Sequence, residues 1–171
     1  MKYLSLLITG VLLTIISNAQ PINDHFVNAI DVTNLLGSCS SDAAYSTVGA
    51  TADGTKGSCW NNSSVLNNVW FKFTAPSTGQ IYVDVGVFGS KGTQARTLLA
   101  LWEDDGITEL ACDRYVSNND NVALGAVGLT PGGTYYISVD VQNSSYRGTF
   151  TLCLDSLVDY DFYEGALDVT S

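Results

Sequence analysis

Beyond its N-terminal stretch, the chain repeats short runs in which apolar and polar side chains alternate, separated by Gly, Pro, Asn and Asp. The run Val69–Thr74 is the clearest, and residues 135–141 alternate in the same way. Because alternate side chains of a strand point to opposite faces, Val69, Phe71 and Phe73 share one face. The chain is therefore expected to fold from β-strands that bury one side.

Turn-forming residues divide the chain into about eight or nine such strands at regular spacing. This series predicts an all-β fold, a jelly-roll-like antiparallel β-sandwich of two sheets. Residues 97–102 are apolar throughout, which is typical of a strand covered on both faces. Asp105 and Gly106 are expected to form a hairpin turn. The predicted strands are residues 29–33, 46–51, 69–74, 81–85, 97–102, 107–112, 122–127, 135–141 and 150–154.

The N-terminus has the features of a secretory signal peptide. Lys2 precedes an apolar stretch at residues 4–16, and Ser17 and Ala19 are small residues placed as in a cleavage site. The stretch is shorter than the about 20 residues that a spanning helix needs, so no membrane insertion is expected after cleavage. The protein is therefore predicted to be secreted or held at the cell surface.

The end of the chain resembles the beginning of its mature part. Residues 23–33 and 160–170 share Asp, Ala, Asp, Val and Thr in register, as tandem copies of one module do. We therefore divide the chain into a signal peptide (1–19), one β-sandwich domain (20–158) and the truncated start of a second repeat (159–171). The domain is expected to have covalent neighbours in a longer chain.

The charge balance bears on the choice of partners. The 17 acidic residues outnumber the seven basic ones, and the net charge is −10. A chain this acidic repels nucleic acid and anionic membrane surfaces, so neither is an expected partner.

Four cysteines, an even number in an exported chain, predict two disulfides. The residues are Cys39, Cys59, Cys112 and Cys153. Three connectivities are open, and we expect Cys39–Cys59 and Cys112–Cys153, which would join segments expected to be neighbours. A zinc site is the alternative, but the sequence has no C-x-x-C pair with a partner histidine.

Several motifs, in their order and spacing, resemble the bacterial pre-peptidase C-terminal domain and its relatives in exported Bacteroidetes-type proteins. The resemblance implies a jelly-roll-like accessory domain beside secreted peptidases or adhesins. Some relatives bind collagen or polysaccharide, and some hold calcium near an Asn-Asp pair, which maps to Asn23 and Asp24. Residues 20–22 depart from the acidic residues that usually precede that pair. The motifs are residues 23–30, 69–76, 97–102, 110–113, 129–139 and 148–152.

Calcium is the one metal or cofactor that the sequence brings into question. In proteins, calcium binds about six to eight oxygen ligands, which come from carboxylates, amides and carbonyls. The candidate ligands are Asn23, Asp24, Asp104 and Asp113. The alternative is that these residues stand in turns because they form turns.

The sequence favours binding over catalysis. His25 is the single histidine and no G-x-S-x-G motif is present, so no catalytic residue is assigned. Trp60, Asn61 and Tyr146 are the candidate ligand-binding residues, since exposed rings stack on sugars or anchor a partner. Half-buried packing of these rings is the alternative. The expected function is a non-catalytic accessory or adhesion module that binds an extracellular glycan or matrix protein. The second candidate is a structural spacer beside a secreted peptidase or other hydrolase, stabilised by calcium.

Overall fold

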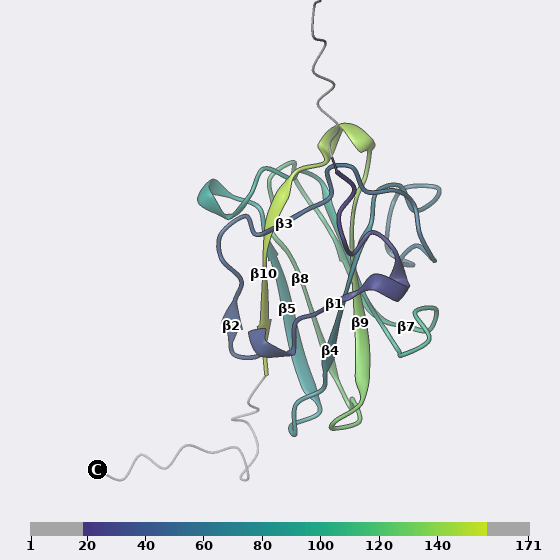
Figure 1. Ribbon diagram of the computed structural model, residues 1–171, viewed down its shortest axis with the longest axis vertical. Helices are drawn as coiled ribbons and strands as arrows, with labels where there is room; N and C mark the ends of the chain where they lie inside the picture. Colours follow the sequence, from purple (N-terminus) through teal and green to yellow (C-terminus); the bar gives the residue numbers. More distant parts are fainter. Residues whose placement is uncertain (1–18, 157–171) are drawn as a thin grey trace, which may run out of the picture.

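The computed structural model describes residues 19–156, which fold into ten β-strands and four short 3-10 helices (Figure 1). The predicted cleavage segment up to residue 18 and the predicted second repeat lie outside the described residues. No helix of the described part is long and apolar enough to cross a membrane. The strands are β1 (Ile30–Asp31), β2 (Ser38–Cys39), β3 (Tyr45–Ser46), β4 (Val69–Thr74), β5 (Gln80–Gly86), β6 (Thr97–Trp102), β7 (Glu109–Arg114), β8 (Val122–Val127), β9 (Thr134–Val141) and β10 (Thr149–Asp155). The 3-10 helices are η1 (Phe26–Asn28), η2 (Thr33–Leu35), η3 (Gly89–Lys91) and η4 (Ser144–Tyr146).

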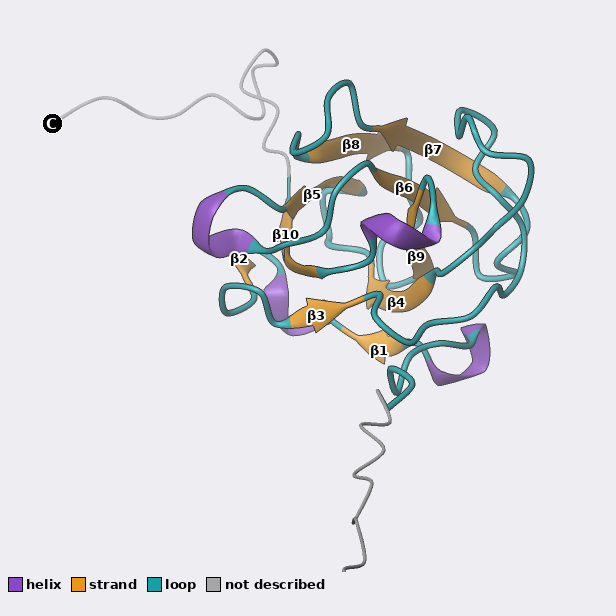
Figure 2. Ribbon diagram, turned by 90° about the horizontal axis from the view of Figure 1, so that it is seen from above, coloured by secondary structure: helices purple, strands orange, loops and turns teal. Residues whose placement is uncertain are grey.

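Two sheets pack face to face, which confirms the predicted all-β sandwich (Figure 2). One has five strands in the order β1-β4-β9-β6-β7, and the other has four in the order β3-β10-β5-β8. Strand β1 pairs with β4 in parallel, and the other paired strands are antiparallel. The expected strands at residues 69–74, 97–102 and 122–127 have the predicted bounds. Strand β2 was not expected, and β3 lies at residues 45–46 instead of within 46–51.

The main core lies between the sheets and follows from the alternation in the sequence. On β4, Val69, Phe71 and Phe73 point into this core, as predicted, and Phe71 stacks edge-on against Phe150 of β10. Burying these side chains removes their apolar surface from water and contributes about 1.5–3 kcal/mol for each large residue. The hairpin turn is confirmed as well, since Gly106 has a left-handed φ of +65° between β6 and β7.

A second apolar cluster covers the outer face of the five-stranded sheet. Residues 52–68, which we call the covering segment, contribute Trp60 and Val65 to it. They pack over the outward side chains of β4 and β6, which are Trp70, Leu98, Ala100 and Trp102. Strand β6 is buried on both faces as predicted, and the covering segment is the reason.

The carboxylate of Asp140 fastens the covering segment to β9. Its oxygens accept hydrogen bonds from the backbone N–H groups of Leu66 (2.9 Å) and Asn67 (2.8 Å), and from that of Val141 (2.7 Å). The side chain is fully buried, and burial raises its pKa while the three donors act in the opposite direction. A second anchor lies at the other end of the segment, where Ser58 donates twice to Glu109 of β7.

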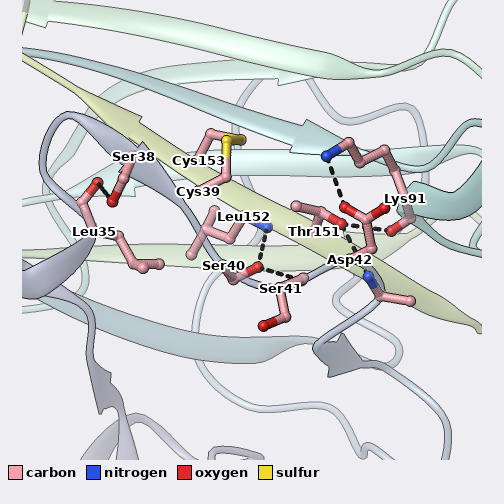
Figure 3. Close-up of a disulfide and its surroundings, with 11 residues drawn as sticks. Leu35, Ser38, Cys39, Ser40, Ser41, Asp42, Lys91, Thr151, Leu152 and Cys153 are labelled. Atoms are coloured by element: carbon pink, nitrogen blue, oxygen red, sulfur yellow. Dashed lines mark hydrogen bonds and ion pairs between the residues drawn. A yellow bond between two sulfur atoms is a disulfide. The ribbon is translucent and has the colours of Figure 1, made fainter.

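Both disulfides form, but the expected connectivity is wrong. The bonds are Cys39–Cys153 and Cys59–Cys112, not Cys39–Cys59 and Cys112–Cys153. Cys39 lies in β2 beside β10, where Ser40 N–H donates to the Leu152 carbonyl and Leu152 N–H donates to the Ser40 hydroxyl (3.2 Å); Figure 3 draws the second of these bonds. The Cα atoms of Cys39 and Cys153 are 4.0 Å apart.

The second disulfide depends on the covering segment. This segment crosses the outer face of the sheet and brings Cys59 to Cys112 on β7, with 6.1 Å between their Cα atoms. The partners are 114 residues apart in the first bond and 53 in the second. Closeness in sequence therefore predicts neither disulfide.

Peptide mapping without reduction checks the connectivity. We expect one disulfide-linked peptide pair to contain Cys39 and Cys153 and the other to contain Cys59 and Cys112. A linked peptide pair that contains Cys39 and Cys59 would contradict the path of the covering segment.

Replacing Asp140 should loosen the covering segment. Asp140→Ala leaves three backbone N–H groups without their acceptor, and we expect a loss of about 2–4 kcal/mol in the free energy of unfolding. Urea unfolding measures the loss, and hydrogen exchange should rise first within residues 52–68. Asp104→Ala, at an exposed turn position, is the control and should change stability by less than about 0.5 kcal/mol. Equal effects of the two variants would argue against the anchoring role.

Candidate functional site

Three loops meet at one end of the sandwich, which we call the loop end (top of Figure 1, where η4 lies). They are residues 87–96 between β5 and β6, residues 115–121 between β7 and β8, and residues 142–148 between β9 and β10. Backbone hydrogen bonds tie them together: Arg96 N–H donates to the Asn118 carbonyl (2.9 Å), and Gln142 N–H donates to the Arg96 carbonyl (3.1 Å). The loop end is thus a connected surface built on rigid strands.

Arg96 is the centre of the loop end. Its backbone has a left-handed φ of +47°, which is uncommon for a residue with a side chain. The guanidinium donates from Nε to Asn118 Oδ1 (2.7 Å) and from Nη1 to Gln142 Oε1 (3.1 Å). It also lies 4.6 Å from the ring centre of Tyr146 and 5.6 Å from that of Tyr115. Two rings and two amides therefore fix a charged plane at the surface.

A shallow hollow adjoins this cluster on the side of the covering segment. It has a volume of about 470 Å³ and is lined by Asn61, Asp113, Arg114, Tyr115 and Val116. Asn61 Nδ2 donates to Tyr115 Oη (3.0 Å), so the hollow and the Arg96 cluster share Tyr115.

Positive charge gathers at the loop end although the chain is acidic. The sequence has three arginines, and each flanks a strand there: Arg96 precedes β6, Arg114 ends β7 and Arg147 precedes β10. Arg147 Nε donates to the Ser144 carbonyl (2.7 Å), which fixes the start of its side chain within the loop.

Two acidic side chains near these arginines make hydrogen bonds within the protein. Asp113 Oδ2 accepts from Ala123 N–H (2.9 Å). Hydrogen bonds from the hydroxyl and the backbone N–H of Ser117 hold the pKa of Asp120 below its ordinary value. These carboxylates therefore help to shape the loops.

A family comparison agrees with this architecture. The model of a family described as galactose binding domain-like, associated with the T9SS (type IX secretion), matches residues 22–152. The chain belongs to this family. Galactose-binding-like domains of this group are typically non-catalytic accessory modules. Their T9SS association and the two disulfides indicate an exported or surface protein of the Bacteroidetes type. The more specific resemblance to the pre-peptidase C-terminal domain is not confirmed by this match. No curated protein matched the chain.

The predicted ligand-binding residues of this galactose-binding-like domain have different surroundings. Tyr146 lies at the loop end, and Asn61 of the covering segment is linked to it through Tyr115 and Arg96. Trp60 is only 3% exposed, and its Nε1 donates to the Leu99 carbonyl (3.1 Å). The expectation of an exposed Trp60 ring is therefore wrong, because the polar loop around it folds flat onto the sheet.

Sequence reasoning did not assign the role of Arg96. The available signal was that all three arginines flank predicted strands at alternate connections, which places them at one end of an antiparallel sandwich.

The predicted calcium ligands are dispersed in the structure. Asn23 Nδ2 donates to the Trp70 carbonyl (2.9 Å), and Asp24 accepts from Thr51. Asp104 is in the β6–β7 turn, and Asp113 is on β7. Within residues 19–156, no group of three His, Cys, Asp or Glu side chains is placed to hold a metal ion. Calcium binding therefore stays a prediction of the sequence alone.

A double-mutant cycle tests the Arg96–Tyr146 contact. From urea unfolding of Arg96→Ala, Tyr146→Ala and the double variant, we expect a coupling energy of about 0.5–1 kcal/mol, because the cation lies over the ring. Tyr82, on the outer face of the other sheet, gives the control cycle with Arg96. That pair should be additive within about 0.3–0.5 kcal/mol. Additivity in both cycles would mean that the stacked pair does not hold the loop end together.

Proposed function

We propose that this domain is an accessory module of an exported protein and binds an extracellular glycan at the loop end. The observation that supports it most is Arg96, fixed between Tyr115 and Tyr146 at a surface where three loops meet. Aromatic edges with neighbouring amides and a guanidinium are the groups that orient sugar rings, whose hydroxyls both donate and accept hydrogen bonds. Asn61 adds a further amide beside Tyr115. The description of the family as galactose binding domain-like points to the same ligand class.

The charge at this end favours an acidic glycan. The three arginines of the chain lie there, although the net charge is −10. Guanidinium groups pair with carboxylate or sulfate through two parallel hydrogen bonds. An acidic chain repels anionic polymers over most of its surface, so such a ligand would be directed to the loop end.

The binding experiment compares two polymers that share a sugar ring. Polygalacturonate carries a carboxylate on the ring that neutral galactan lacks. We expect tighter binding of polygalacturonate by isothermal titration calorimetry, weakening as salt rises. Tyr146→Ala and Arg96→Gln should each weaken binding by about tenfold, or about 1.4 kcal/mol.

The matched control is Tyr82→Ala. Tyr82 is 40% exposed on the outer face of the four-stranded sheet, near the start of β5, whereas the loop 87–96 follows the other end of that strand. Its removal should leave binding unchanged, and circular dichroism should show all variants folded. Weakening by Tyr82→Ala alone would move the binding surface to the other sheet.

Two other functions remain as alternatives. If neither polymer binds but a matrix protein such as collagen does, and the loop-end variants weaken it, the module is a protein adhesin. If no ligand binds in either class, the proposal fails and the structural spacer is the better account.

A further inference from the structure

The opening residues of the domain supply the edge strand of the larger sheet. Residues 24–33, which we call the opening strap, include β1, which pairs in parallel with β4. The register places Ile30 opposite Phe71 and Asp31 opposite Lys72. Val32 N–H continues the pairing with a bond to the Lys72 carbonyl (2.8 Å). The strap therefore occupies the outer edge of β4.

Particular side chains lock the strap in this register. Asp24 is 2% exposed and accepts hydrogen bonds from the N–H and hydroxyl of Thr51 (both 2.6 Å). Val32 is 1% exposed in the main core. Phe26 stacks against Trp70 and Tyr136.

The last turn of the strap is held by a paired acid and hydroxyl. Asp31 Oδ1 accepts from Thr33 N–H (3.0 Å) and Thr33 Oγ1 (2.7 Å), and these bonds lower the pKa of Asp31. Thr33 Oγ1 in turn accepts from Thr74 N–H at the end of β4 (2.9 Å).

Residues 161–170 repeat the locking residues and differ elsewhere. The identical positions are Asp24, Ala29, Asp31, Val32 and Thr33, each of which makes a packing or hydrogen-bond contact just described or packs on the outer cluster. Phe26 and Ile30 are matched in kind by Tyr163 and Leu167.

The remaining three positions of the strap are exposed. His25, Val27 and Asn28 correspond to Phe162, Glu164 and Gly165, and Val27 is 85% exposed. The two segments therefore differ in chemical type only at side chains that the strap does not need to pack against β4. A second copy of the strap would need the same contact-making residues at the same positions, and residues 161–170 have them.

We propose that residues 161–170 are a second opening strap, which binds along the β4-type edge of another module of this same fold. In the described domain that edge is already paired with residues 30–31. The partner is therefore a separate module, and modules of this kind would follow one another along a chain. This inference does not depend on glycan binding at the loop end.

A strap exchange tests the proposal within the chain from Gln20 to Ser171. Five substitutions convert residues 24–33 into the sequence of 161–170: His25→Phe, Phe26→Tyr, Val27→Glu, Asn28→Gly and Ile30→Leu. Because the locking contacts are kept, we expect a folded protein whose melting temperature lies within about 5 °C of the parent. The proposal is overturned if the exchanged protein does not fold.

The control has nearly the same composition in the wrong register. Placing the sequence of residues 160–169 at positions 24–33 moves both Asp, the Ala and the Val by one position and removes the Thr, while position 26 keeps a Phe. Within β1 a shift of one residue turns each side chain to the opposite face. This variant should melt at least about 10 °C lower. Equal melting of the shifted and the in-register variants would show that the recurrence carries no docking information.

Sedimentation of the parent chain distinguishes binding of the second strap to a different module from its binding to a second copy of this chain. We expect a monomer at tens of micromolar, because each β4 edge holds its own strap. A dimer that disappears when residues 159–171 are removed would mean that copies of this chain exchange straps, and it would overturn the proposal of a separate module.

Discussion

The fold depends on covering the outer face of the five-stranded sheet. Strands β4 and β6 present two tryptophans and a leucine on that face, and an isolated sandwich would leave them in water. The covering segment shields these side chains, and the Asp140 carboxylate holds that segment against the sheet by accepting hydrogen bonds from its backbone. Trp60 and Cys59 lie on this segment, which the contact of Ser58 with Glu109 attaches to the sheet a second time. The architecture is accordingly a sandwich with a third, irregular layer on one side.

The sequence predicts the sheets well because a period of two is a local property. Strands β4, β6 and β8 have the expected bounds, and the hairpin turn is marked by Asp105 and Gly106. Disulfide pairing is not local, since it depends on which strands become neighbours in the folded sheets. Cys39 comes within bonding distance of Cys153 only because β2 lies beside β10 in the folded domain.

In the candidate site, too, the sequence predicts local properties but not contacts between distant segments. Asn61 and Tyr146 stand in polar loops, and the sequence alone marks them as surface groups. Trp60 has equally polar neighbours, yet it is buried because Asp140, about 80 residues away along the chain, draws its segment onto the sheet. The role of Arg96 was also hidden, because its contacts come from three different loops.

The Cys39–Cys153 bond has a mechanical consequence for a module in a chain under tension. A pulling force that enters near residue 20 and leaves near residue 156 passes through this covalent link and bypasses residues 40–152. Those residues, including both sheets' central strands and the loop end, bear no load. Extension is confined to the 19 residues before Cys39 and the three after Cys153, which at full stretch span about 73–79 Å in all. A surface protein built from such modules would lengthen by detachment of its straps while every loop end stayed folded.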